Sequence, residues 1–252
     1  MFDAIAHPHI LVVGASQGIG LGFVRQFLAN PHIAHIYATY RRPETAAGLF
    51  ALQTDRRLTC LNLDITDEKQ IIQLMQQIQQ QTQQLHGLIN CVGLLHGGEL
   101  QPEKSLRQLN AANLGQYFQI NSIGAVLLAK QALPLFQHDE PSVLATLSAK
   151  IGSIGDNHLG GWYGYRASKA ALNMLMRTAA IEYQRKRTHT IIALLHPGTT
   201  DTQLSQPFQR NVPEGKLFPV ERTVRQLLDV IEQLTPADSG EFFNWDGTRL
   251  PW

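Results

Sequence analysis

Short apolar runs alternate with longer amphipathic stretches along the chain. The short runs lack polar alternation, which is typical of β-strands that are covered on both faces. They cover residues 10–13, 33–39, 58–61, 88–91, 142–147 and 191–195. Apolar residues at helical spacing predict helices over residues 20–28, 71–84, 114–135, 164–185 and 220–234. Strands that alternate with helices predict a parallel sheet with helices on both faces.

The composition supports one folded domain. The chain has 252 residues, 44% of them hydrophobic, and no linker or change of composition divides it. We therefore expect a single doubly wound α/β domain of the Rossmann type over residues 1–252. A net charge of +1, with no basic cluster, predicts no binding to nucleic acid or to an anionic membrane. The sequence has no signal peptide pattern and only two cysteines, both in apolar segments, so we expect a cytoplasmic protein.

A glycine-rich turn, GASQGIG over residues 14–20, follows the first predicted strand and precedes the first predicted helix. Glycines let the backbone approach phosphates, and the amides and dipole of a helix N-terminus favour negative charge. A purely structural strand–helix turn would explain the glycines as well, but the position after the first strand favours a diphosphate site. The residues that we expect to bind a dinucleotide here are Gly14, Ser16, Gln17, Gly18, Ile19 and Gly20.

The end of the second predicted strand indicates which dinucleotide binds. An acidic residue there binds a ribose 2′-hydroxyl, whereas arginine accommodates a 2′-phosphate. The chain has Arg41 and Arg42 at this point and no carboxylate before Glu44. This favours NADP(H) over NAD(H), although an exposed basic turn would have the same sequence.

Tyr165 and Lys169 open the predicted helix over residues 164–185. Positions i and i+4 share one face of a helix, so the phenol and the ammonium project to the same place. A nearby positive charge lowers the pKa of a tyrosine and prepares it for proton transfer. By itself this spacing is common by chance.

In combination and in this order, the motifs are specific. The glycine turn is followed by Asn90-Cys91-Val92-Gly93 after a strand, Asn121 in a helix, Tyr165 with Lys169, and His196-Pro197-Gly198 after a late strand. The chain resembles the short-chain dehydrogenase/reductase family of the single-domain type over essentially its whole length. Residues 162–173 and 242–247 resemble the C-factor-like and sniffer-like carbonyl reductase branch.

The resemblance implies roles for the catalytic residues. Tyr165 would be the general acid and base, and Lys169 would lower its pKa and hold the nicotinamide ribose. Asn121 would anchor a water that connects Lys169 to solvent as a proton relay.

The resemblance also implies a set of cofactor contacts. Asn90 and Gly93 would shape the pocket, and Asp64 with Ile65 would hold the adenine. Asp64 has the alternative role of capping the helix that follows it. Around the nicotinamide carboxamide, the resemblance implies the segment that begins with Pro197 and Gly198, the backbone of Thr200 and the hydroxyl of Thr202.

One departure from the family pattern bears on catalysis. The family's catalytic serine stands three residues before a glycine, and counting back from Gly152 gives Ala149. The neighbouring Ser148 is our candidate for the catalytic serine, although adjacent strand residues point to opposite faces. Ser153 is a second candidate. If neither hydroxyl reaches the substrate, one hydrogen-bond donor is missing and catalysis weakens by a factor of order 10²–10³.

Two functions follow from these patterns. The first is an NADP(H)-dependent oxidoreductase that reduces an aldehyde or ketone under a mobile lid over residues 200–219. The second is a nucleotide-binding regulatory protein of the C-factor type with weak or no catalysis. The resemblance implies a homodimer or homotetramer. We expect no metal site, because the pair His32 and His35 has no cysteine or carboxylate cluster to complete it.

Overall fold

The computed structural model describes residues 1–186 and 188–252. Its main sheet has seven strands in the order β3-β2-β1-β4-β5-β6-β9, and every neighbouring pair is parallel. The strands are β1 (His9–Val13), β2 (His35–Tyr40), β3 (Leu58–Asn62), β4 (Gly87–Asn90), β5 (Ser142–Leu147), β6 (Thr190–His196) and β9 (Phe242–Asn244). This confirms the predicted doubly wound α/β fold.

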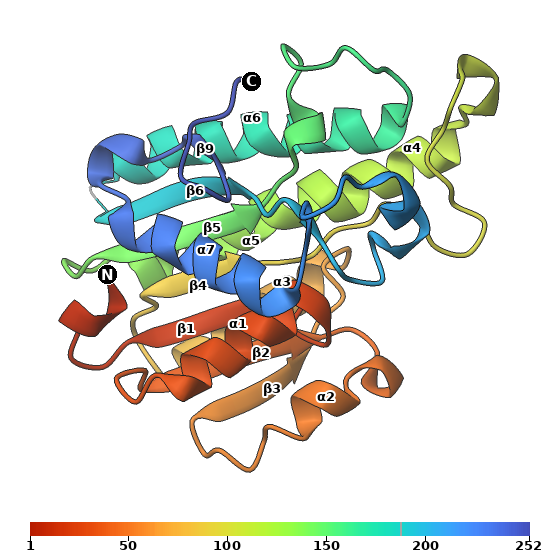
Figure 1. The fold of residues 1–252 in the computed structure, drawn as a ribbon. Coiled ribbons are helices and arrows are strands. Elements are labelled where there is room, and N and C mark those ends of the chain that lie inside the picture. The colour runs from red at the N-terminus through yellow and green to blue at the C-terminus, as the bar shows by residue number, and fades with distance from the viewer. Residues whose placement is uncertain (187) are drawn as a thin grey trace.

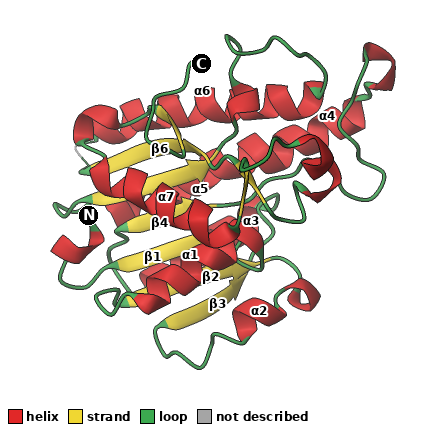
Figure 2. Cartoon of the chain, in the orientation of Figure 1, coloured by secondary structure: helices red, strands yellow, loops and turns green. Residues whose placement is uncertain are grey.

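Helices cover both faces of the sheet (Figures 1 and 2). On one face, α1 (Gly18–Ala29) and α7 (Val220–Gln233) pack in one apolar core. On the other face, α3 (Glu68–Gln79), α5 (Gly124–Ala132) and α6 (Tyr163–Arg185) pack in a second apolar core. Two short helices, α4 (Ala111–Phe118) and α2 (Ala47–Phe50), complete the α-helical elements of the described residues.

The strands are as apolar as the sequence predicted. Every residue of β4 and β5 is buried, and in β1 and β6 only the terminal residues His9 and His196 are not fully buried. Central strands that are covered by helices on both faces bury successive side chains, which explains the continuous apolar runs.

Helix α3 is shorter than predicted. It begins after Asp67, whose carboxylate caps it by accepting hydrogen bonds from the backbone N–H groups of Lys69 and Gln70. It ends at Gln79 and not at residue 84. The chain must turn there, because the buried Leu85 directly precedes the sheet and contributes to the core on that face.

The helix predicted over residues 114–135 is two helices joined by a π-helical turn. Between α4 and α5, residues Gln119–Ile123 adopt π-helical hydrogen bonding, and a 3₁₀ turn at Leu133–Phe136 follows α5. Such π turns occur frequently at functional sites. This one contains Asn121.

Three short β elements were not predicted. β9 has three residues, and β7 (Thr199–Thr200) pairs with β8 (Leu217–Phe218) in a separate two-stranded sheet. Segments of two or three residues are too short to show a periodic pattern. In the described part of the chain, none of the helices combines the length and apolar character needed to cross a membrane.

Candidate active site

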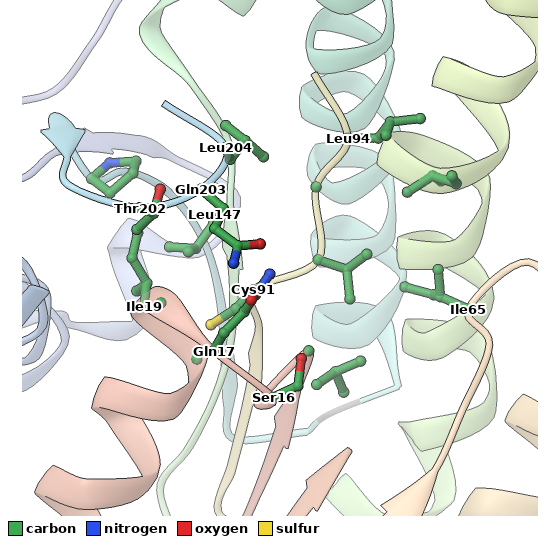
Figure 3. Close-up of a pocket in the computed structure, with 18 of the residues that line it drawn as sticks. Ser16, Gln17, Ile19, Ile65, Cys91, Leu94, Leu147, Thr202, Gln203 and Leu204 are labelled. Atoms are coloured by element: carbon green, nitrogen blue, oxygen red, sulfur yellow. The ribbon is translucent and has the colours of Figure 1, made fainter. Parts of the chain in front are cut away.

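A cavity of about 540 Å³ opens at the carboxyl edge of the main sheet. Its walls come from the loops that follow β1, β2, β3, β4, β5 and β6, and from the start of α6. Figure 3 shows Ser16, Gln17 and Ile19 beside the turn that leads into α1, with Leu94 and Ile65 on the opposite side. Crevices at this edge are where doubly wound folds bind their ligands.

Most of the predicted site residues line this cavity. They are Gly14, Ser16, Gln17, Gly18, Ile19, Gly20, Arg41, Ile65, Gly93, Ser148, Tyr165, Lys169, Pro197 and Thr202. Six others are not among its lining residues, namely Arg42, Asp64, Asn90, Asn121, Gly198 and Thr200. The structure therefore gathers segments from almost the whole chain at one edge of the sheet and leaves some candidates outside the cavity lining.

The glycine turn is built for a close approach of the backbone. Gly14 has a φ of +80°, and a Cβ on Gly20 would lie 2.2 Å from the carbonyl oxygen of Gly14. Within the described residues, α1 begins at Gly18 with no side-chain cap, so its first amides stay available to a ligand. These features fit the diphosphate of a dinucleotide.

Thr39 holds the turn from the neighbouring strand, and sequence reasoning did not select it. Its hydroxyl accepts a hydrogen bond from the Gly14 N–H (3.0 Å), and its carbonyl accepts one from the Ala15 N–H (2.7 Å). Thr39 also lines the cavity. A threonine in an apolar strand is common, so the sequence carries no signal for this role.

The two arginines after β2 have different surroundings. Arg41 lines the cavity, whereas the exposed Arg42 has its Nε 3.9 Å from a carboxylate oxygen of Glu44. Asn62 holds this turn by donating from its side-chain amide to the carbonyl of Arg41 (2.9 Å). Both side chains are exposed, and the difference between them is that Arg41 borders the cavity.

Asp64 is held by local hydrogen bonds. Its carboxylate accepts from both the backbone N–H and the hydroxyl of Thr66, at 2.9 and 2.7 Å. Burial works against ionisation, but these bonds and the nearby Arg41 keep the pKa of Asp64 below its usual value. The helix that follows is capped by Asp67, so the alternative role of Asp64 as its cap is wrong.

Tyr165 and Lys169 meet on the buried face of α6. Both side chains are buried, and the Lys169 Nζ lies 5.9 Å from the centre of the Tyr165 ring. The ammonium donates a hydrogen bond to the carbonyl of Leu147 at the end of β5 (2.9 Å). Burial lowers the pKa of Lys169 to about 8.

The pKa of Tyr165 moves in the opposite direction to the one expected. Burial of the phenol, with a smaller contribution from the neighbouring Tyr117, raises it above its ordinary value. Removing the phenol from water disfavours the charged phenolate. In this structure burial therefore makes Tyr165 a weaker acid than a free tyrosine.

Asn121 lies behind the cavity wall. Its side-chain amide accepts from the Leu94 N–H (2.7 Å) and donates to the Leu94 carbonyl (2.9 Å) and to the Ser168 hydroxyl (3.0 Å). It thereby ties the loop after β4 to α6. A Cβ on Gly93 would lie 3.7 Å from Lys169 Nζ and 3.9 Å from Asn121 Oδ1, so these three residues are neighbours.

Among the described residues, the hydroxyls of the two candidate serines form their hydrogen bonds with groups other than Tyr165. The Ser148 hydroxyl donates to Asn173 Oδ1 on α6 (2.6 Å), so its proton is directed into the protein. Ser153 lines a separate hollow, with Tyr163 and Arg166. Ala149 packs in one apolar cluster with Tyr165, and its methyl group stands where the family pattern has a serine.

The segment over residues 200–219 closes one side of the cavity. Thr202, Gln203 and Leu204 line it, as Figure 3 shows, and a Cβ on Gly18 would lie 3.2 Å from the Thr202 methyl group. His96 holds this segment by donating from Nε2 to the carbonyls of Gln203 (3.2 Å) and Leu204 (3.1 Å). The segment contains a 3₁₀ helix over Gln206–Asn211, so it has regular structure of its own.

Gly198 and Thr200, which were predicted to lie near the nicotinamide carboxamide, pack against other parts of the protein and support the segment over residues 200–219. Gly198 has a φ of +72°, and a Cβ there would lie 2.7 Å from the Phe218 ring. The Thr200 hydroxyl bonds that of Thr223 on α7 (2.9 Å), while its carbonyl accepts from Ser205.

Folding creates a histidine cluster at the amino edge of the sheet that the sequence did not reveal. Ring nitrogens of His86 and His138 and a carboxylate oxygen of Glu140 all lie within 4.8 Å of one another. His86 Nδ1 accepts the His9 N–H (3.1 Å), so its Nε2 carries the proton and donates to Glu140 (2.9 Å). Both ring nitrogens of His86 are therefore engaged in hydrogen bonds, while His138 donates from Nε2 to the carbonyl of Leu85 (2.8 Å).

The fold and the site together define a dinucleotide-dependent oxidoreductase. The chain belongs to the short-chain dehydrogenase family, because residues 8–213 match the model of that family. This confirms the family resemblance and the assignment as an oxidoreductase.

Several individual proteins of known sequence or structure are similar to this chain. The chain is 33% identical to the C-signal protein of Myxococcus xanthus over 148 residues, which cover 59% of this chain and 84% of that protein. It is 30% identical to a benzil reductase ((S)-benzoin forming) of Saccharomyces cerevisiae over 82% of this chain and 77% of that protein. Among solved structures, the NADPH-bound carbonyl reductase from chicken fatty liver superposes with a TM-score of 0.87 at 28% identity, covering 98% of this chain and all of that one. The carbonyl reductase Sniffer of D. melanogaster gives a TM-score of 0.86 at 27% identity with the same coverage.

Proposed function

We propose that the protein is an NADP(H)-dependent reductase of aldehydes or ketones, in which Tyr165 is the general acid. The observation that carries this proposal is the position of Tyr165 and Lys169, whose side chains meet at the cavity that the glycine turn opens into. A carbonyl bound beside Tyr165 would receive the phenolic proton on its oxygen as negative charge develops there. The cofactor, when bound, supplies the hydride.

The buried lysine beside Tyr165 supports a role for the phenol in proton transfer. Burial raises the pKa of Tyr165, so the phenol keeps its proton until negative charge develops on the substrate oxygen. Lys169, whose pKa is about 8, is charged at neutral pH and would resupply that proton. Asn121 would anchor the water that connects Lys169 to solvent.

The choice of cofactor rests on Arg41. A guanidinium at the cavity wall would pair with a ribose 2′-phosphate, and the backbone of the glycine turn would bind the diphosphate. NADPH-bound and NADP-bound relatives support this preference. Arg42 is placed outside the cavity and would contribute little.

A second candidate is a nucleotide-binding regulatory protein with little turnover. The similarity to C-signal and the methyl group of Ala149 in the place of a serine favour it. The protein would then bind NADPH through the same turn, and its regulatory function would not require the reduction of a carbonyl substrate.

For the assembly, we propose a homodimer or homotetramer in the cytoplasm. Exposed apolar side chains on α6, Met174 and Ile181, support self-association. The free cysteines Cys60 and Cys91 are compatible with a reducing compartment. Light scattering on a sizing column tests the assembly.

The test of the function is NADPH oxidation against a panel of aldehydes, ketones and quinones, with Tyr165→Phe measured alongside. We expect turnover that falls by a factor of about 10²–10⁴ in the variant, because the proton donor is lost. NADPH binding, followed by fluorescence, should be unchanged. Equal turnover in both proteins would remove Tyr165 from the mechanism. Tight NADPH binding without turnover on any substrate would favour the regulatory function.

A further inference from the structure

A buried carboxylate lies against the first turn of the catalytic helix. Glu103, in the loop between β4 and α4, is 2% exposed. Its Oε2 accepts a hydrogen bond from the backbone N–H of Gly164 (3.1 Å), and its own carbonyl oxygen accepts one from the backbone N–H of Trp162. Glu103 therefore holds two amides of the chain that enters α6, from a point about 60 positions away in the sequence.

The chain needs to be held at this point. Trp162, the residue before α6, has a φ of +52° and is the one non-glycine residue with a positive φ in the described chain. It follows two glycines, Gly160 and Gly161, with φ of +65° and +66°. A bulky side chain in the left-handed region is strained and persists where surrounding contacts impose it. Such strain is concentrated at functional sites.

The residues next to the two amides that Glu103 holds belong to the active site. Tyr165 is the third residue of α6, one position after Gly164. The Trp162 ring lies 6.3 Å from the Tyr165 ring and 4.8 Å from the ring of Phe208, in the segment that closes the cavity. A change in the entry to α6 would therefore move both the proton donor and an aromatic side chain beside it.

The Glu103 side chain is fixed against the first turn of α6. One of its oxygens accepts the Gly164 N–H, and the other, Oε1, is fully buried and has no hydrogen-bond partner among the described residues. A Cβ on Gly164 would lie 2.9 Å from Oε1 and 2.4 Å from Tyr117, so the packing leaves little room for the first turn to shift.

We propose that Glu103 is a positioning residue for the reduction. By bonding the amides of Trp162 and Gly164, it fixes the left-handed entry to α6 and with it the direction of the Tyr165 hydroxyl. The proposal rests on the proposed function, since the Tyr165 hydroxyl is taken as the proton donor. The essential interaction is the Gly164 N–H donating to the Glu103 side chain, and the negative charge is not required.

The experiment compares three variants in the full-length protein. Glu103→Ala removes the side-chain acceptor, whereas Glu103→Gln keeps a carbonyl oxygen for the Gly164 N–H without the charge. Glu99→Ala is the matched control, because Glu99 is an exposed acid of the same loop. For each variant we would measure kcat, the KM for NADPH, and hydrogen–deuterium exchange of peptides that cover residues 160–168.

We expect Glu103→Ala to lower kcat about 10- to 100-fold, because a small misplacement of a catalytic group can cost that much. The KM for NADPH should stay within about threefold, since the glycine turn is untouched. Exchange over residues 160–168 should become faster. Glu103→Gln should restore kcat to within about threefold of the original protein and restore slow exchange, and Glu99→Ala should change neither.

Two results would overturn the proposal. One is a Glu103→Gln variant as slow in turnover and as fast in exchange as Glu103→Ala, because the charge and not the bond would then matter. The other is a Glu103→Ala variant with altered melting temperature but unchanged kcat and unchanged exchange near Tyr165, which is a structural role only. The exchange measurement needs no substrate. If the original protein shows no turnover that depends on Tyr165, the proposed function fails. Hydrogen–deuterium exchange over residues 160–168 then still tests whether Glu103 fixes the start of α6.

Discussion

The two halves of the cavity are held in different ways. The cofactor half consists mainly of the backbone over residues 14–20, and its closest support, Thr39, lies on the adjacent strand. The catalytic half consists of side chains from the loops after β4 and β5 and from α6, and its supports, Asn121 and Glu103, are themselves held by hydrogen bonds to distant segments. The first half depends on local chain geometry, and the second on long-range packing.

The two halves also differ in how much room they leave for a substitution. In the glycine turn, a Cβ on Gly20 would collide with the Gly14 carbonyl oxygen. At the catalytic half a side chain can be smaller while the fold remains. Ala149, two residues after β5, packs in the same apolar cluster as Tyr165.

After the loss expected for Tyr165→Phe, the largest effect that we expect from a substitution in the catalytic half is a gain of activity. Ala149→Ser would place a hydroxyl beside Tyr165, where it would donate a hydrogen bond to the substrate oxygen. By analogy with an oxyanion donor, kcat/KM should rise by a factor of about 10²–10³. Steady-state kinetics with the best substrate of the carbonyl panel measures this.

Ser148→Ala is the control for that gain. The Ser148 hydroxyl is bonded to Asn173, so its loss should change kcat/KM by less than about threefold while lowering the stability by about 1 kcal/mol. Urea unfolding gives the second quantity. If Ser148→Ala instead abolished turnover, Ser148 would be the catalytic serine and the hydroxyl would have to rotate toward the substrate.

The pH dependence of the reaction tests the catalytic half next. Burial lowers the pKa of Lys169 to about 8, so its charge is present below that pH and is lost as the pH rises through it. Because the ammonium assists Tyr165 in the proposed mechanism, kcat/KM for reduction should fall about fivefold between pH 8 and pH 9. The ratio of activities with NADPH and NADH should stay constant over this range, since Arg41 remains charged. A flat profile to pH 9.5 would remove the charge of Lys169 from the mechanism.

A smaller effect is expected at the cofactor half. Arg41→Ala should raise the KM for NADPH about tenfold and leave that for NADH unchanged, because one charge-assisted hydrogen bond to the 2′-phosphate contributes about 1.5 kcal/mol or more. Arg42→Ala is the matched control, since that side chain is exposed and faces Glu44. Equal effects of the two substitutions would mean that the positive charge of the turn attracts the 2′-phosphate in general, without a specific contact from Arg41.

The sequence predicted the sheet well because its signals are local. All six expected strands are present with ends within about two residues, since continuous apolar runs and flanking turns mark them. The prediction was poorer for elements whose local structure depends on packing against distant segments. The helix over residues 114–135 is interrupted by a π turn at Asn121, and the last strand, Phe242–Asn244, has too few residues to show a period.

The candidate site divides in the same way. The motifs selected Gly14, residues 16–20, Arg41, Tyr165 and Lys169, which line the cavity. The pKa of Tyr165 moved against expectation because the burial of a phenol depends on everything packed around it. Glu103 gave no signal in the sequence, because nothing distinguishes it from other loop acids until folding buries it.

By itself, then, the sequence determined the order of strands and helices, the glycine turn after the first strand and the shared helix face of Tyr165 and Lys169. Each of these depends on residues a few positions apart, where backbone geometry sets the distance. The tertiary structure alone decided that the Ser148 hydroxyl bonds Asn173, that Ala149 joins the apolar cluster of Tyr165 and that Glu103 bonds the first turn of α6. Those outcomes depend on which distant groups share a buried space, and the free energy of burying a polar group is settled only when all its neighbours are in place.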